Sequence, residues 1–391
     1  MPGRVTRRQT SGRGAARARG MPQGLEGVVV GVSAICAIDG ARGRLSYRGY
    51  DIADLVAQAT FPEVVLLLWH GELPPRARLR RLEADLRRAG DLPDAALALL
   101  RRLPAQAPPL AVLRTMVSAL AHLDPDARAP SPAAAQRNAL RLVAQVPTIA
   151  AAFHRIRRGR GLPPRRDDLG HAARFLYMLH GAVPDPEAAR ALDAVWILYA
   201  DHEFNASTFA ARVTAATGAD VHAAVTSALG ALMGPLHGGA AEDVSRLLGR
   251  IGVPRRARAV VDGLLAAGRR IPGFGHRVYR GEDPRATLLR QIAGALAERA
   301  GEGRWYEITR AVEAAVRVRR TVHANVDLYA PALYAALGIP QDLYAAVFAG
   351  GRVAGWTAHI LEQYGDNRLI RPLAEYIGPS PRAFVPLAAR R

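Results

Sequence analysis

Hydrophobic positions along the chain recur mainly at the three- and four-residue spacing of helices. The clearest case follows residue 305, where apolar side chains occupy positions i, i+3, i+4, i+7 and i+8, namely Ile308, Ala311, Val312, Ala315 and Val316. This spacing places them along one face of a helix. The pattern predicts a helix that is packed along that stripe and polar on its other side.

The segment TFPEVVLLLWHGELPP, residues 60–75, carries the boundary signals of a second helix. Thr60 and Glu63 form a capping box before the apolar run, and Gly71 ahead of two prolines marks the end. Proline-containing stretches such as DPDARAPSPAA and RRGRGLPPRRDD are typical of exposed loops between helices. No repeat of fixed period occurs. The chain is therefore predicted to be mainly α-helical.

One segment departs from helical spacing. In SAICAIDGARGRLSYRG, residues 33–49, two apolar stretches flank an Asp39-Gly40 turn. This arrangement predicts a small β-hairpin near the N-terminus.

Length and composition limit the class of protein. The chain has 391 residues, half of them hydrophobic, which is enough for a large core and about two domains. Its longest apolar runs, such as VVLLLW, are far shorter than the roughly 20 residues that cross a bilayer. Cys36 is the single cysteine, so an internal disulfide is impossible. We expect no membrane association and a cytoplasmic location.

The charge favours an anionic partner only weakly. The formal net charge is +19, yet the sequence has no lysine, which excludes a Schiff-base lysine and a P-loop. Residues 1–20 hold six arginines and no acidic residue, which predicts a disordered tail. A basic nucleic-acid-binding protein remains an alternative. However, aromatic residues make up only 6%, and the arginines form no single stripe, so we expect no nucleic-acid partner.

Two glycine-flanked bends each hold one histidine. In GPLHGGAAED, His237 lies at or just before a helix start, where the positive end of the helix dipole favours a neutral ring that can donate a hydrogen bond. In IPGFGHRVYRGEDPRA, His276 is followed by Arg277, Arg280 and Arg285, which suit a carboxylate or phosphate. Both bends are therefore candidates for chemistry on an anionic ligand.

Each of these residues also has an ordinary structural interpretation. A lone histidine is commonly a surface or core residue, Asp327 fits the N-cap of the helix that follows it, and Arg352 fits a helix cap or a surface ion pair. A zinc site is disfavoured because no HExxH motif occurs and the His202-Glu203 pair lacks a second histidine at helical spacing.

Eight segments taken together resemble successive blocks of the citrate synthases, in the order of that family, from about Gly24 to Pro379. They are GLEGVVVGVSAICAIDGARGRLSYRGYDIADL, LRTMVSAL, VPTIAAAFHRIRRG, ILYADHEFNASTFAARV, GPLHGGAAEDV, PGFGHRVYRGEDPRA, HANVDLYAPALY and GRVAGWTAHILEQYGDNRLIRPLAEYIGP.

The resemblance implies a condensation of acetyl-CoA with oxaloacetate followed by hydrolysis of citryl-CoA. Asp327 matches the carboxylate base of the family, His237 its donor to the thioester carbonyl, and His276 its donor to the oxaloacetate carbonyl. Acetyl-CoA is a co-substrate, and neither a metal nor another cofactor is implied. The close relative 2-methylcitrate synthase, which uses propionyl-CoA, is the alternative within the enzyme class.

The resemblance also implies ligand-binding residues. Those similar to the oxaloacetate ligands of the family are His202, Arg285, Arg352 and Arg371. Arg371 would reach across from a second subunit, which implies a homodimer. Arg280 matches a contact to CoA phosphate, and the loop of Gly273, Phe274 and Gly275 matches the loop that receives the CoA adenine.

The implied fold has two almost wholly helical domains. The larger would comprise residues 21–235 and 335–391, with the dimer helices, and the smaller would comprise residues 236–334. The active-site cleft would lie between them.

Overall fold

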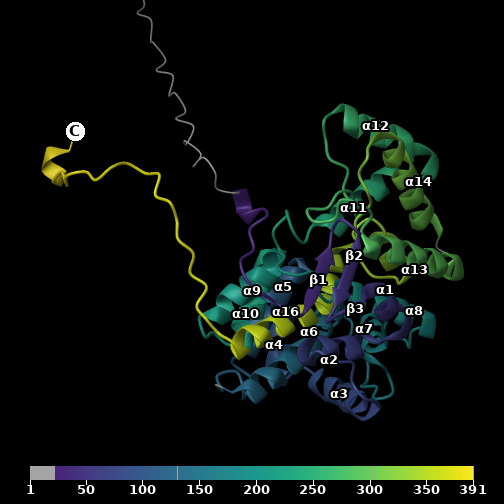
Figure 1. The fold of residues 1–391 in the computed structure, drawn as a ribbon. Helices are drawn as coiled ribbons and strands as arrows, with labels where there is room; N and C mark the ends of the chain where they lie inside the picture. Colours follow the sequence, from purple (N-terminus) through teal and green to yellow (C-terminus); the bar gives the residue numbers. More distant parts are fainter. Residues whose placement is uncertain (1–22, 130, 302, 391) are drawn as a thin grey trace, which may run out of the picture. The chain divides into compact units, whose positions relative to one another are not determined.

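The computed structural model describes residues 23–129, 131–301 and 303–390 (Figure 1). The predicted tail of residues 1–20 lies outside the described residues. The chain divides into a large unit, Ser33–Leu369, and a unit that contains residues 23–32 and 370–390.

The large unit is mainly α-helical, as the sequence predicts. Its α-helices are α1 (Ile52–Gln58), α2 (Phe61–His70), α3 (Arg76–Ala89), α4 (Asp94–Arg102), α5 (Pro109–Leu120), α6 (Pro132–Ile156), α7 (His171–His180), α8 (Pro186–Tyr199), α9 (Ala206–Ala216), α10 (Val221–Leu232), α11 (Ala240–Ile251), α12 (Ala257–Ala266), α13 (Pro284–Ala300), α14 (Gly303–Arg319), α15 (Ala330–Ala336) and α16 (Tyr344–Gly365). Short 3-10 helices cover η2 (Pro254–Arg256) and η3 (Gln341–Leu343).

The predicted hairpin is present and gains a third strand. Strands β1 (Cys36–Asp39) and β2 (Arg44–Tyr47) pair antiparallel, with Asp39 opposite Arg44, so the turn spans residues 40–43. The strand β3 (Tyr50–Asp51) pairs with β2. Two residues are too short to show an alternating pattern, which is why the sequence did not reveal β3.

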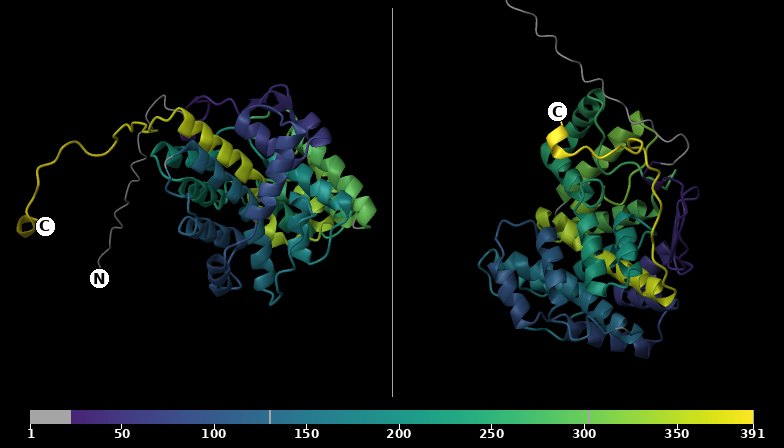
Figure 2. Two further views of the ribbon diagram at one scale, coloured as in Figure 1. Left: turned by 90° about the horizontal axis from the view of Figure 1, so that it is seen from below. Right: turned by 90° about the vertical axis from the view of Figure 1, so that its left-hand side faces the viewer.

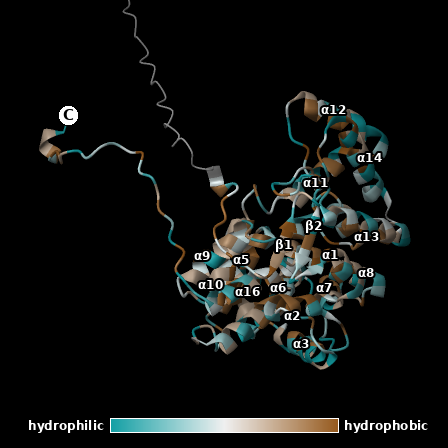
Figure 3. Cartoon of the chain, in the orientation of Figure 1, coloured by the Kyte–Doolittle hydropathy of each residue, from teal (hydrophilic) through white to brown (hydrophobic). Residues whose placement is uncertain are grey.

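The predicted boundaries of α2 are confirmed. The backbone N–H of Thr60 donates to Glu63 Oε2 at 2.7 Å, which satisfies a donor that the helix start would otherwise leave unpaired. Gly71 ends the helix in a left-handed conformation with φ of 90°. Figure 3 shows that apolar residues dominate α2, whereas α3 carries long hydrophilic stretches.

Helix α16 forms the centre of the core. It runs through the middle of the helices (Figures 1 and 2), contacts α2, α6, α8 and α9, and has most of its residues buried. A side chain at Gly350 or Gly351 would press on Trp196 of α8, so the two glycines allow α8 and α16 to pack closely. The same helix carries Arg352 into the interior.

Helices α11 to α15 contact one another within the large unit. Helix α14 packs on α12 and α13, and Ile308, Val312 and Val316 of its predicted stripe are buried. Helix α13 also contacts α15, α8 and α1. The division of the chain into residues 21–235 with 335–391 and residues 236–334 remains a prediction.

The smaller unit has little regular structure. It includes η1 (Gln23–Leu25) and η4 (Leu387–Ala389), and several of its large apolar side chains are exposed, among them Leu373, Tyr376 and Phe384. Across residues 23–129, 131–301 and 303–390, no helix has both the length and the hydropathy needed to cross a membrane.

Candidate active site

Six of the residues predicted from the sequence line one cavity of about 170 Å³. They are His202, His237, His276, Arg285, Asp327 and Arg352. They come from the α8–α9 turn, the loop before α11, the loop and first turn at the start of α13, the loop before α15, and α16. The fold therefore gathers side chains that lie up to 150 positions apart in the sequence.

Backbone hydrogen bonds join the loop of His276 to the loop of Asp327. The N–H of Gly275 donates to His323 O, and the N–H of Asn325 donates to Gly273 O, each at 2.9 Å. Gly273 has φ of 83°, and a Cβ there would lie about 3.0 Å from Leu328. Glycine is thus required for both the backbone conformation and the close approach of the two loops.

Two backbone donors fix the ring of His276. Its Nδ1 accepts hydrogen bonds from the N–H groups of Val278 at 3.0 Å and Tyr279 at 3.1 Å. Burial, with help from Arg285, lowers the pKa of His276 to about 4. A neutral ring whose Nδ1 accepts must carry its proton on Nε2, so His276 can donate from Nε2.

His237 lies two residues before Gly239, the N-cap of α11, which confirms its predicted place before a helix start. Its Nε2 is 2.8 Å from Ser207 Oγ, and that oxygen also accepts from Trp356 Nε1 at 3.1 Å. Ser207 Oγ donates in turn to Asn205 Oδ1 at 2.8 Å. Burial and then Arg352 lower the pKa of His237 to about 4, so the ring is neutral near pH 7.

Asp327 does not cap a helix, so that alternative is wrong. Helix α15 begins at Ala330 with Tyr329 in the N-cap position. Burial raises the pKa of Asp327 to about 6, although Arg285 and Arg352 act in the opposite direction. The carboxylate is therefore a stronger base than an exposed aspartate.

Arg352 is only 2% exposed, which excludes the alternative of a surface ion pair. Its Nε donates to Tyr199 O at 2.5 Å, and burial lowers the pKa of its guanidinium. Arg285 is 3% exposed and binds Asp283 through two nitrogens, at 3.0 and 2.8 Å. Burial would lower the pKa of Arg285, but Asp283 outweighs burial and raises it. The cavity thus presents two buried guanidinium groups.

His202 is 8% exposed, and its ring meets that of His276 edge-on with centroids 5.0 Å apart. Its Nε2 is buried and has no hydrogen-bond partner among the described residues. Burial and then Arg285 lower the pKa of His202 well below its usual value. This nitrogen is therefore available to a ligand bound in the cavity.

The remaining predicted residues do not line this cavity. Arg280 is exposed and its N–H donates to Gly40 O, while Gly273, Phe274 and Gly275 form the loop beside His276. Arg371 belongs to the smaller unit, where its side chain is exposed. In the part of the chain that the structure describes, no cluster of three or more histidine, cysteine or acidic side chains is arranged to hold a metal ion.

The cavity also contains residues that the sequence analysis missed. These are Tyr199, Asn205, Asn325, Tyr334, Tyr344 and Phe348. Ser207 and Trp356 add the contacts to His237. Their signal was weak because aromatic residues and asparagines at helix ends are common in any helical core.

Comparisons with known proteins identify the family of the chain. Residues 24–373 match the family described as "Citrate synthase, C-terminal domain". The chain is 43% identical to "Citrate synthase 2" of Bacillus subtilis over 94% of this chain and 99% of that protein. It is 44% identical to "Citrate synthase" of Haloferax volcanii over 95% and 99%, and 40% identical to "2-methylcitrate synthase" of Shewanella oneidensis over 94% and 97%.

Solved structures give the same result. The citrate synthase of Pyrobaculum aerophilum matches with a TM-score of 0.87 and 38% identity, over 94% of this chain and 95% of that one. The Thermoplasma acidophilum citrate synthase, solved as a ternary complex with carboxymethyl coenzyme A and oxaloacetate, matches with a TM-score of 0.86 and 32% identity, over 94% and 98%. The chain belongs to the citrate synthase family, whose members are acyl-transferring enzymes.

Proposed function

We propose that this enzyme condenses acetyl-CoA with oxaloacetate and hydrolyses the resulting citryl-CoA to citrate and CoA. The observation that carries the proposal is the cavity itself, where one carboxylate, two neutral donor imidazoles and two buried guanidinium groups converge. The complex of the Thermoplasma acidophilum relative with a CoA analogue and oxaloacetate supports the same pair of substrates.

Asp327 would remove a proton from the methyl group of acetyl-CoA. A thioester methyl is a very weak acid, so the raised pKa of Asp327 supports its role as base. His237 would donate a hydrogen bond to the thioester oxygen as negative charge develops there.

This role requires a particular tautomer of His237. Because its Nε2 faces Ser207, the donor to the thioester must be Nδ1–H, and Nε2 must accept. The single hydroxyl proton of Ser207 would then turn from Asn205 Oδ1, which still accepts from the N–H of Thr208, to His237, while Trp356 Nε1–H donates to the same oxygen. Ser207 and Trp356 would thus hold His237 in its productive form.

The enol carbon would next attack the keto carbon of oxaloacetate. His276, with Nδ1 held by two backbone donors, would offer Nε2–H to the keto oxygen and protonate it as the new bond forms. Arg285, Arg352 and His202 would hold the two carboxylates of oxaloacetate, since guanidinium groups pair with carboxylates in two-pronged geometry. Hydrolysis of the citryl thioester releases CoA.

Further features of the proposal rest on the resemblance to the family. Arg280 would contact CoA phosphate, the loop of Gly273, Phe274 and Gly275 would receive the adenine, and Arg371 would complete the site of a second subunit in a homodimer. The enzyme would be cytoplasmic and would need neither a metal nor a cofactor besides its co-substrate.

Release of CoA with oxaloacetate and either acetyl-CoA or propionyl-CoA tests the proposal. We expect a higher kcat/KM for acetyl-CoA. A preference for propionyl-CoA would instead assign 2-methylcitrate synthase. The measurement is needed because the two thioesters differ by one methylene, which changes the binding free energy in an apolar pocket by only about 1–3 kcal/mol. Absence of turnover with both thioesters would overturn the proposal.

A further inference from the structure

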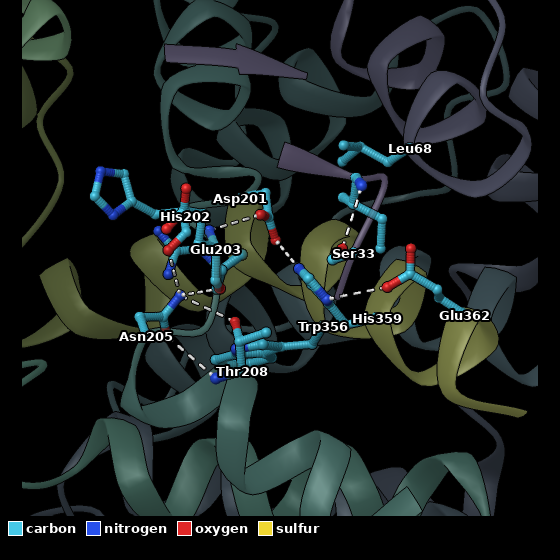
Figure 4. A network of polar contacts seen from close by, with 12 residues as sticks. Ser33, Leu68, Asp201, His202, Glu203, Asn205, Thr208, Trp356, His359 and Glu362 are labelled. Carbon is cyan, nitrogen blue, oxygen red and sulfur yellow. Dashed lines mark hydrogen bonds and ion pairs between the residues drawn. The ribbon is translucent and has the colours of Figure 1, made fainter. Parts of the chain in front are cut away.

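A buried histidine–carboxylate pair lies behind the site. His359 of α16 and Asp201, which follows α8, are both fully buried, and His359 Nε2 is 3.1 Å from Asp201 Oδ2 (Figure 4). Neither atom has another hydrogen-bond partner among the described residues. Burial of an unpaired carboxylate is costly, so Asp201 depends on His359 for its main polar contact.

The ring of His359 is oriented from its other side. Arg212 Nη1 donates to His359 Nδ1 at 3.0 Å and to Glu362 Oε2 at 2.5 Å. Because Nδ1 accepts, the proton of a neutral ring sits on Nε2 and faces Asp201. Phe204 lies against the Arg212 guanidinium, 4.7 Å from the ring centroid. The result is a polar chain from Glu362 through Arg212 and His359 to Asp201.

Asp201 immediately precedes His202, and the backbone on both sides of His202 is held. Tyr47 Oη donates to Asp201 O at 3.0 Å, and Asp201 Oδ1 accepts from the N–H of Glu203 at 3.0 Å. Glu203 has φ of 52°, which is uncommon for a residue other than glycine, and its side chain accepts from the N–H of Ile38 in β1. Between these anchors, His202 points away from the pair (Figure 4) and lines the cavity.

We propose that Asp201 and His359 are positioning residues that hold His202 in its place at the substrate cavity. Neither of them lines the cavity. Because Asp201 directly precedes His202 in the chain, the pair would act on the substrate through the position of His202. The inference rests on the proposed function in one respect, which is the assignment of His202 to oxaloacetate.

The charge of the pair supports this role. Burial alone would raise the pKa of Asp201, but His359 and Arg352 outweigh it and lower that pKa. Asp201 therefore stays ionised near pH 7, and its charge faces the buried Arg352 from behind the cavity. Loss of His359 would therefore leave a buried charge without its partner next to the backbone that carries His202.

The kinetics of two substitutions at one position test the inference. His359→Leu removes the donor to Asp201, whereas His359→Gln keeps an N–H donor of similar reach. We expect His359→Leu to raise KM for oxaloacetate on the order of tenfold or more, with a smaller change in KM for acetyl-CoA, because misplacing a binding group by a fraction of an ångström weakens its contact. His359→Gln should recover most of the loss. If His359→Leu fails to fold, His359→Asn replaces it, because its amide is too short to reach Asp201.

A second buried histidine–aspartate pair provides a matched control. His222 is 1% exposed, lies 3.5 Å from Asp124, and does not line the cavity. His222→Leu should lower the melting temperature without changing KM for oxaloacetate. If His359→Leu and His222→Leu change this KM equally, the role of His359 is merely structural and the inference is overturned.

His202→Ala separates failure of the inference from failure of the proposed function. If His202→Ala leaves KM for oxaloacetate unchanged, the assignment of His202 to oxaloacetate fails, and the inference fails with it. If His202→Ala raises KM but His359→Leu does not, only the positioning role is overturned. We expect both variants to raise KM, and His359→Leu to raise it less.

Discussion

At the scale of single residues, the chemistry depends on how burial changes proton affinity. His237 and His276 are neutral because burial lowers the pKa of each to about 4, while burial raises the pKa of Asp327 to about 6. Two neutral donors and one strengthened base therefore coexist near pH 7.

Asp327→Asn should abolish turnover while oxaloacetate still binds. Asparagine keeps the size of the side chain but cannot accept the proton, so we expect a fall in kcat of at least about 100-fold. Exchange of tritium from labelled acetyl-CoA, measured with a non-reacting oxaloacetate analogue, isolates this step from condensation. Exchange at the wild-type rate would remove Asp327 as the base.

The same substitution should stabilise the protein at neutral pH. An aspartate whose pKa rises from 3.8 in the unfolded chain to about 6 in the folded one favours folding below pH 3.8, and this contribution is lost as the pH rises through 6. Asparagine resembles the protonated form, so Asp327→Asn should gain up to about 3 kcal/mol at pH 8 and little at pH 4. Denaturant unfolding at both pH values measures the difference. An equal effect at the two pH values would contradict the shifted pKa.

The activity of the wild-type enzyme should follow the same group. Because the deprotonated form of Asp327 is the base, kcat/KM for oxaloacetate, which reports groups of the free enzyme, should fall below about pH 6. A pH profile of kcat/KM measures this fall. If kcat/KM instead stays constant down to about pH 4, the pKa of Asp327 in the working enzyme is not raised.

At the scale of elements, the position of the site depends on how closely α16 approaches the turn after α8. A Cβ on Gly355 would overlap Ala200 O and Asp201 Oδ2, so only glycine fits there. Helix α16 thus carries Arg352 into the cavity and also sets the distance to the segment that holds His202.

Gly355→Ala should therefore affect both stability and substrate affinity. Overpacking of this kind costs about 1–3 kcal/mol, and relief would push the Asp201 segment away from α16. We expect a lower melting temperature and a raised KM for oxaloacetate. Gly230→Ala is the control, since a Cβ at this position in α10 meets no neighbour within 4 Å. If Gly355→Ala keeps the wild-type KM for oxaloacetate, the distance between α16 and the Asp201 segment does not set the position of His202.

The elements that the sequence predicted are those with strong local signals. The capping box at Thr60 and the turn after Asp39 are decided within a few residues, and both are confirmed. The partners of His237 were not predictable, because Ser207 and Trp356 meet it only after α9 and α16 pack. Two local interpretations were wrong because the sequence does not show which side chains become buried. Asp327 resembled an N-cap and Arg352 a surface group, but both line the cavity, where burial raises the pKa of Asp327 and encloses Arg352.

At the scale of the whole molecule, the proposed dimer makes a test of Arg371 possible. If Arg371 of one subunit serves the site of the other, mixing two inactive variants, Arg371→Ala and Asp327→Asn, creates heterodimers with one intact site. Random reassociation should then restore up to about a quarter of wild-type activity, because half of the dimers are mixed and each has one working site of two. No recovery, despite verified subunit exchange, would place Arg371 in the site of its own subunit.

The short backbone bridge between Phe274 and Ala324 has a further consequence for motion. The amides of Gly275 and Asn325 are both donors in this bridge, so neither loop can open while the other keeps its hydrogen bonds. In deuterated solvent, the two amides should lose protection at one common rate, and both should slow together when oxaloacetate is added. The imidazole and the carboxylate would then enter and leave their working arrangement as a single cooperative unit.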